Sequence, residues 1–216
     1  MVDYLERIRT EVKQRLSEPA HDFYHSERVY NLGVRIATVE KADIIVVGAS
    51  AYLHDLLRYS DKDKGLNYHV SKEAVQEIRK VLKGVDFPLV KLPQVLYAIE
   101  LHEDYSSDAA SSRNTLEGKV LQDADRLDAI GAIGIARCFT FSGHYSSPLW
   151  VPEISLETSV YNPTRLNTSA IHHFYEKLLK LKDAMHTSAG RRIAEERHHF
   201  MEKFLTQFFA EWKGEK

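Results

Sequence analysis

The sequence has few of the cysteines that cross-link extracellular domains and few of the prolines and glycines that build turn-rich folds. Its 216 residues include one cysteine, six prolines and ten glycines. The single cysteine, Cys138, cannot form an internal disulfide, and it lies in an apolar helical run, which favours a core thiol in a reducing compartment. So few glycines and prolines exclude a collagen-like chain and a turn-rich β-sandwich. These shortages are typical of a globular cytoplasmic protein.

Long apolar runs and an excess of one charge are also missing. The most apolar segment, Ile44–Leu57, spans about 14 residues and contains His54 and Asp55, so it is too short and too polar to cross a bilayer. The N-terminus becomes charged within three residues and lacks the apolar stretch of a signal peptide. A formal net charge of −2 leaves no basic excess for nucleic acid polymers or an anionic membrane. We expect a small-molecule partner and a monomer or homodimer.

Apolar positions recur at helical spacing along most of the chain. This spacing predicts helices at 3–17, from Asp22 or Ser26 through Ile36, at 44–57, about 70–83, 93–103, 115–142, 169–186 and 188–213. Asp43 is the expected N-cap of the helix at 44–57. The 115–142 helix is expected to bend near Gly131 or Gly134, and 143–168 is expected to be a loop that could close over a site. No strand pattern or second-domain linker is present, so the prediction is one all-α domain over 1–216.

Aromatic residues and histidines on the C-terminal segment have ordinary structural explanations. One side of the last helix is expected to be core and carries Ile193, Phe200, Phe204, Phe208 and Trp212. A set of histidines among charged neighbours is expected to face solvent, namely His172, His173, His186, His198 and His199.

Two groups of polar residues sit where an apolar helix should be buried. His54 and Asp55 place an imidazole beside a carboxylate at the end of the most apolar helix, where an unpaired charge is costly. A buried ion-paired aspartate beside a hydrogen-bonded histidine would also explain this pair. Further along, three carboxylates crowd about one and a half turns of another apolar helix, and like charges repel unless a cation intervenes. They belong to Asp123, Asp125 and Asp128, and Arg126 could satisfy one of them.

A metal ion would resolve both groups at once. Together His25, His54, Asp55 and Asp125 would offer two imidazoles and two carboxylates. This mixed donor set suits Mn²⁺, Fe²⁺, Co²⁺, Ni²⁺ or Zn²⁺ and leaves positions for water. Helical spacing alone puts residues 125 and 128 on nearly the same face, so it leaves both carboxylates as candidates. His21 precedes the expected helix start and is expected to have a supporting role.

These residues occur in a recognisable order. His25-x-x-Arg28-Val29, then Leu53-His54-Asp55, then Asp123-Ala124-Asp125-Arg126-Leu127 resembles the H…HD…D signature of HD-superfamily phosphohydrolases. The rest of the chain, including 173–179, is similar to the bacterial branch that contains the YpgQ and YedJ proteins. The resemblance implies a single-domain HD-type helical bundle, with a metal-binding core at about 20–140 and C-terminal helices at about 169–213 packing on it.

The resemblance also implies a site and a reaction. The family ligands map to His25, His54, Asp55 and Asp125, the last chosen because it matches the family's Ala-Asp-x-Leu segment. They would hold one divalent ion, with Mn²⁺ first and Fe²⁺, Co²⁺, Ni²⁺, Zn²⁺ or Mg²⁺ as alternatives. The implied activity is hydrolysis of a small phosphorylated substrate, a nucleotide before others, by attack of a metal-bound hydroxide on phosphorus. Some relatives release pyrophosphate from nucleoside triphosphates.

Other residues complete the predicted site. His54 and Asp55 are expected to act in catalysis together with His102, which ends an apolar helix. Cationic side chains suited to phosphate oxygens are Arg28, Arg58, Lys62 and Lys177.

Arg58 departs from the family pattern, because several relatives carry an acid three positions after the aspartate of the HD pair. This weakens a guanosine tetraphosphatase reading and leaves the general base unassigned, with Asp61 and Asp63 as candidates if their loop folds back. It favours an alternative function, a metal- and nucleotide-binding module without turnover. A purely structural helical bundle without metal is the third hypothesis.

Overall fold

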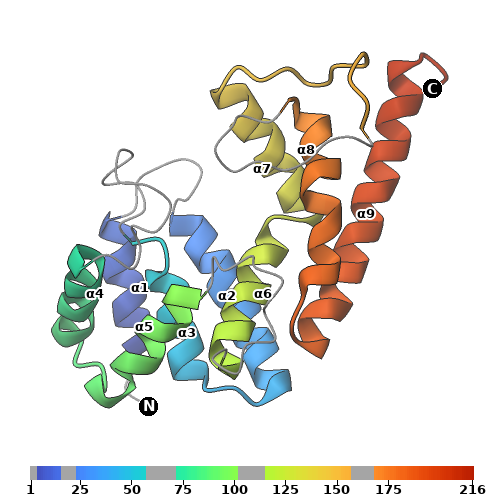
Figure 1. Ribbon diagram of the computed structural model, residues 1–216. Helices are drawn as coiled ribbons and strands as arrows, with labels where there is room; N and C mark the ends of the chain where they lie inside the picture. The colour runs from blue at the N-terminus through green and yellow to red at the C-terminus, as the bar shows by residue number, and fades with distance from the viewer. Residues whose placement is uncertain (1–3, 16–22, 57–71, 102–114, 157–167) are drawn as a thin grey trace. The chain divides into compact units, whose positions relative to one another are not determined.

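The computed structural model describes residues 4–15, 23–56, 72–101, 115–156 and 168–216, and in these residues the protein is helical without strands (Figure 1). The order is α1 (Tyr4–Arg15), α2 (Phe23–Glu40), α3 (Ile44–Leu53), α4 (Lys72–Gly84), the 3₁₀ turn η2 (Leu89–Lys91), α5 (Leu92–Leu101), α6 (Leu116–Asp128), α7 (Gly131–His144), α8 (Ala170–Glu176), the 3₁₀ helix η3 (Leu178–Ala184) and α9 (Ser188–Trp212). The predicted all-α fold is confirmed. Within these ranges no helix combines the length and apolarity that a bilayer crossing requires.

The chain divides into two compact units. The first spans Met1–Asp125 and contains α1 to α5 and most of α6. The second spans Arg126–Lys216 and contains the end of α6, α7, α8, η3 and α9. The predicted division, a metal-binding core at about 20–140 with C-terminal helices packed on it, stays a prediction.

Helix α3 is the centre of the first unit. It packs against α1, α2 and α5, and every residue from Val46 to Leu53 is buried. Small side chains allow this close approach: a Cβ added at Gly48 would lie 3.0 Å from side-chain atoms of both Leu5 and Tyr30. At this distance an extra methyl group would require the neighbouring side chains to shift. Since α3 ends at Leu53, the next two residues emerge inside the unit and not at its surface.

The start of α3 is fixed by Asp43, the N-cap that the sequence predicted. Its carboxylate accepts hydrogen bonds from the backbone N–H groups of Ile45 at 3.0 Å and Val46 at 3.3 Å. Lys91 of η2 forms an ion pair with the same carboxylate, and the Asp43 backbone N–H donates to Glu117 Oε1 at 3.1 Å. Burial by itself would raise the pKa of Asp43, but the hydrogen bonds from Lys91 and the backbone lower it overall.

We predict that Asp43→Ala destabilises the protein by at least about 1 kcal/mol, because it removes a helix cap. The loss also leaves Lys91 without its carboxylate. Urea unfolding followed by circular dichroism measures the effect. Asp183→Ala is the control, since Asp183 is largely exposed and pairs with the adjacent Lys182. A change of less than about 0.5 kcal/mol in both variants would contradict the role of the cap.

The helix predicted over 115–142 is two helices. Helix α6 ends at Asp128, and α7 begins at Gly131, where the backbone has φ of +76°. A left-handed residue interrupts the hydrogen-bond ladder, and glycine adopts this conformation without steric cost. The interruption of the helix was therefore predicted at the right position, but as a bend within one helix. In the structure one helix ends there and another begins.

The described part of the predicted 143–168 loop is fastened to the first turn of α8. Pro148 O accepts from Ala170 N at 3.0 Å, and Leu149 O accepts from Ile171 N at 3.1 Å. The Nε2–H of His172 donates to Ile154 O at 3.2 Å. The prediction that His172 faces solvent is wrong, since its ring is buried and its Nδ1 lies 2.7 Å from Ser169 Oγ. Residues 157–167 lie outside the described part of this loop.

The buried stripe of α9 differs from the aromatic one predicted. Ala194, Met201 and Leu205 are buried, whereas Phe200 and Trp212 are 51% and 47% exposed. The prediction that these two aromatic residues belong to the core is therefore wrong, since they lie beside the buried stripe and not in it. Core placement of Cys138 is confirmed: the thiol is buried, and burial raises its pKa to about 12.

We predict that His173 makes the protein less stable in acid. Burial, with a smaller effect of nearby Lys177, lowers the pKa of His173 to about 4, against about 6.5 in an unfolded chain. Between these values the unfolded chain binds a proton that the folded protein does not. The stability is thus full above the unfolded pKa and falls as pH drops, by about 2 kcal/mol between about pH 7 and pH 5. Urea unfolding across this range should show a smaller loss in His173→Gln; equal losses would contradict the assignment.

Candidate metal centre

Three helices of the first unit bring together the histidines and aspartates singled out in the sequence. His25 lies in the first turn of α2, His54 is the C-cap of α3 with Asp55 directly after it, and Asp125 lies on α6. His25, His54 and Asp55 are each 1% exposed, and the Asp125 side chain is 17% exposed. The four residues thus form a buried polar cluster that reaches solvent through Asp125.

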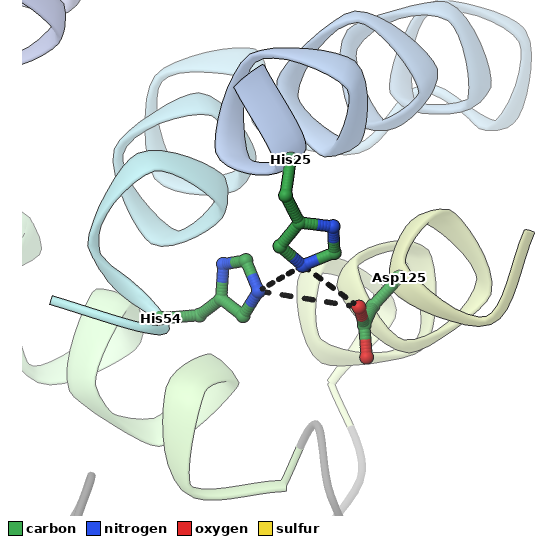
Figure 2. Close-up of side chains that lie close together, drawn as sticks. All are labelled: His25, His54 and Asp125. Atoms are coloured by element: carbon green, nitrogen blue, oxygen red, sulfur yellow. Dashed lines mark hydrogen bonds and ion pairs between the residues drawn. The ribbon is translucent and has the colours of Figure 1, made fainter. Parts of the chain in front are cut away.

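The donor atoms of this cluster converge (Figure 2). His25 Nε2 lies 3.3 Å from His54 Nε2 and 3.4 Å from Asp125 Oδ1, and His54 Nε2 lies 4.0 Å from the same oxygen. Asp55 Oδ2 lies 3.6 Å from His25 Nε2 and 3.5 Å from His54 Nε2. Within the described ranges, His25, His54 and Asp125 form a cluster whose ligand atoms all lie within 4.8 Å of one another.

These separations are those of ligands around one ion. Imidazole nitrogen and carboxylate oxygen bind first-row metals at about 2.0–2.2 Å, which places tetrahedral neighbours about 3.4 Å apart. The two imidazole Nε2 atoms lie 3.3 Å from each other and 3.4 to 4.0 Å from the oxygens of Asp55 and Asp125. A single ion therefore fits among these donor atoms after only small movements of the side chains.

One hydrogen bond fixes the orientation of the His54 ring. His54 Nδ1 lies 2.8 Å from the carbonyl oxygen of Ala51, and a carbonyl can only accept, so Nδ1 carries the proton. In the neutral ring, Nε2 then presents its lone pair to the cluster. Burial is the largest influence on the pKa of His54 and lowers it below the ordinary imidazole value, despite the opposing effects of Asp55 and Asp125. Neutral, oriented imidazole is the form that binds metals.

The charges in the cluster favour a proton or a cation between its donor atoms. The lone pair of His54 Nε2 faces the oxygens of two carboxylates, Asp55 and Asp125, at 3.5 and 4.0 Å. Negatively charged oxygens and a lone pair repel one another in a buried site unless a proton or a cation lies between them. The donor set and its burial therefore fit a divalent ion.

Helical spacing alone left Asp125 and Asp128 as alternatives, and the three carboxylates of this helix have different contacts in the structure. Asp125 joins the two imidazoles, whereas Asp128 forms an ion pair of 2.6 Å with Arg137 in the second unit. Asp123 is buried and does not belong to the cluster of the described residues. Arg126, which could have neutralised one of them, donates to Ala184 O and His186 Nε2.

The remaining predicted site residues are not brought to the cluster by described contacts. Arg28 lies on α2 one turn after His25 and is partly exposed. Lys177 follows α8 in the second unit as its C-cap. Several predicted residues lie outside the described ranges, namely His21, Arg58, Asp61, Lys62, Asp63 and His102. The roles proposed for all of them stay predictions.

Sequence reasoning missed the carbonyl of Ala51. A weak signal was present, because Ala51 precedes His54 by three residues at the end of a helix, where carbonyls lack helical partners. A histidine at the C-cap can turn its ring back to such a carbonyl. This backbone contact, and not a side chain, sets the tautomer of the second imidazole.

We predict that His54 is the Nδ1–H tautomer in the metal-free protein at neutral pH. Long-range ¹H–¹⁵N NMR correlations within the ring distinguish the two tautomers. A proton on Nε2 would contradict the hydrogen bond to Ala51. His144, exposed at the end of α7, is the control and should show the mixture of tautomers expected in water.

Comparisons with known proteins agree with this geometry. The HD domain family matches residues 22–130, a range that contains all four cluster residues. The uncharacterized protein YpgQ of Bacillus subtilis (strain 168) is 36% identical over 205 residues, covering 94% of this chain and 90% of YpgQ.

Solved structures cover nearly the whole chain. The crystal structure of B. subtilis YpgQ in complex with ADP has a TM-score of 0.73 at 35% identity, covering 95% of this chain and 93% of that one. An HD-superfamily hydrolase from Bacillus thuringiensis has a TM-score of 0.75 at 32% identity, covering 97% and 96%. The H…HD…D order, the helical fold and these full-length similarities together show that the chain belongs to the HD domain family, among the HD-superfamily hydrolases.

Proposed function

We propose that this protein is a metal-dependent phosphohydrolase that acts on a small phosphorylated substrate, a nucleotide before others. The observation that carries the proposal is the buried cluster in which the Nε2 atoms of His25 and His54 face Asp125 Oδ1 at 3.4 and 4.0 Å. Because Asp125 is the more exposed member, a ligand would approach the cluster from its side.

His25, His54, Asp55 and Asp125 would hold one divalent ion. Two nitrogens and two carboxylates favour Mn²⁺, Fe²⁺, Co²⁺, Ni²⁺ or Zn²⁺ over Mg²⁺, which prefers an all-oxygen shell. Mn²⁺ is our first assignment, since manganese is the usual metal of the relatives that the sequence resembles. When bound, such an ion acidifies water and polarises a phosphoryl oxygen.

The protein's own residues would provide position and charge. The Ala51 carbonyl keeps the His54 lone pair directed at the site, so this ligand needs no reorientation before binding. Asp55 contacts both imidazoles and completes the donor set from the residue next to His54. Arg28, one turn along α2 from His25, carries a planar guanidinium suited to phosphoryl oxygens. Arg58, Lys62, His102 and Lys177 remain our further assignments for substrate contacts.

The substrate class rests on a relative. The B. subtilis YpgQ structure is a complex with ADP, and the similarity to this chain covers 95% of its length. We therefore propose a nucleotide, with cleavage of nucleoside triphosphates to pyrophosphate as the reaction to test first. A nucleoside diphosphate held by a relative also supports a second candidate, a metal- and nucleotide-binding module without turnover.

Metal-stripped protein reloaded with Mn²⁺ should hydrolyse at least one member of a nucleotide panel, with phosphate and pyrophosphate measured separately. Asp125→Asn and His25→Ala should lower turnover by more than about 100-fold, since even the outer partners of metal ligands contribute 10–100-fold. The same variants should lose the stabilisation by Mn²⁺, about 2.7 kcal/mol at 100 times the dissociation constant in the wild type.

His199→Ala and Asp183→Asn are the controls, because both side chains are exposed in the second unit. They should retain turnover and Mn²⁺ stabilisation. Stabilisation without release of either product across the panel would favour the binding module. Unchanged turnover after removal of metal would exclude the proposed mechanism.

A further inference from the structure

The end of α6 is held by more contacts than a helix terminus needs. The last carbonyls of an α-helix have no partners within the helix and are usually satisfied by solvent or by a short turn. Such a turn is present: Ala129 N donates to Arg126 O at 3.1 Å, and Ile130 N donates to Leu127 O at 3.2 Å. Two arginines of the second unit add further donors to this terminus.

These arginines come from different helices. Arg197 of α9 donates from Nη1 to Leu127 O. Arg137 of α7 donates to Asp128 O at 3.2 Å and forms the 2.6 Å ion pair with the Asp128 carboxylate. Guanidinium groups at a helix C-terminus interact favourably with its dipole, and charge-assisted hydrogen bonds are stronger than neutral ones. We call Arg137 and Arg197 together the arginine clamp.

Gly131 provides the space that the clamp needs. A Cβ added at this residue would lie 2.9 Å from Arg197 Cγ and 3.0 Å from Arg197 Cβ. Its φ of +76° would also strain any other residue. The Arg197 stem therefore lies directly against the backbone turn that ends α6, and a side chain at 131 would displace it.

The clamped turn belongs to the same helix as a proposed metal ligand. Asp125 lies two residues before Leu127 and three before Asp128, within the last turn of α6. The backbone of this turn carries Asp125, whose Oδ1 lies 3.4 Å from His25 Nε2. A ligand must be held within about 0.5 Å of its productive position by residues that are themselves fixed.

We propose that Arg197, seated on Gly131, is a positioning residue for Asp125: by capping Leu127 O, it fixes the last turn of α6 and so the place of this ligand in the metal site. The inference rests on the proposed function, because it assumes that Asp125 binds the ion. It differs from an ordinary stability role in one respect. Loss of the cap should alter the metal site itself and not only the free energy of unfolding.

The experiment compares Arg197→Ala with Arg191→Ala, a matched control. Arg191 lies on the same helix and also donates from its guanidinium to a carbonyl, Met185 O at 3.2 Å, but this carbonyl belongs to no part of α6. Co²⁺ is titrated into metal-free protein, and its visible absorption spectrum reports both affinity and ligand geometry. The free energy of unfolding is measured on the same metal-free samples.

We expect Arg197→Ala to weaken Co²⁺ binding about tenfold, the lower end of the effect seen for outer partners of metal ligands, and to change the spectrum. Arg191→Ala should leave both unchanged even where it destabilises the fold equally. Arg197→Lys, which keeps the stem and one donor, should recover most of the affinity. If Arg197→Ala does not fold, Arg197→Gln takes its place, and Gly131→Ala should weaken binding in the same way by displacing Arg197.

Two negative results have different meanings. Equal Co²⁺ affinity and equal spectra in wild type, Arg197→Ala and Gly131→Ala would overturn the positioning role while leaving the proposed metal site intact. Wild-type protein that binds no Co²⁺ would overturn the proposed function, and the inference with it.

Discussion

Inside the first unit, two imidazole nitrogens lie 3.3 Å from each other and 3.4 to 4.0 Å from the oxygens of two carboxylates, and this cluster is the constraint around which that unit is arranged. Carboxylate oxygens and imidazole lone pairs repel one another in a buried site, so this arrangement favours a proton or a cation among them. Burial lowers the pKa of His54 below the ordinary imidazole value, which favours the neutral ring, and the Ala51 carbonyl turns its Nε2 lone pair inward. The donor atoms of the cluster are therefore already oriented to bind a cation.

The packing of α3 makes this cluster possible. A helix that is buried from Val46 to Leu53 delivers His54 and Asp55 into the interior at its end. Its opposite end is anchored by Asp43, whose carboxylate caps α3 and pairs with Lys91. Close contacts at Gly48 allow the neighbouring helices to approach. The buried helix α3 therefore leads directly into His54 and Asp55, which are two of the four proposed ligands.

Particular elements show where sequence patterns sufficed and where they failed. The cap at Asp43 and the helices of the first unit followed from local chemistry, which depends on neighbours in sequence. The single helix expected over 115–142 failed because apolar spacing continues through Gly131, although its backbone breaks the helix. His172 was misplaced because its polar neighbours in sequence do not reveal that Ser169 and Ile154 O satisfy its ring in the interior.

Periodicity, caps and the H…HD…D order are local or linear properties of the chain, so they were enough to predict the all-α fold, the family and the residue types of the site. Helical spacing left Asp125 and Asp128 as alternatives, and the family resemblance favoured Asp125; contacts in the folded protein show which carboxylate meets the imidazoles. Asp125 and Asp128 lie on nearly one face of α6, and the choice depends on what each one contacts, His25 for the first and Arg137 for the second. The contact of Arg197 with Leu127 O on α6 joins segments 70 residues apart, which no spacing along the sequence records.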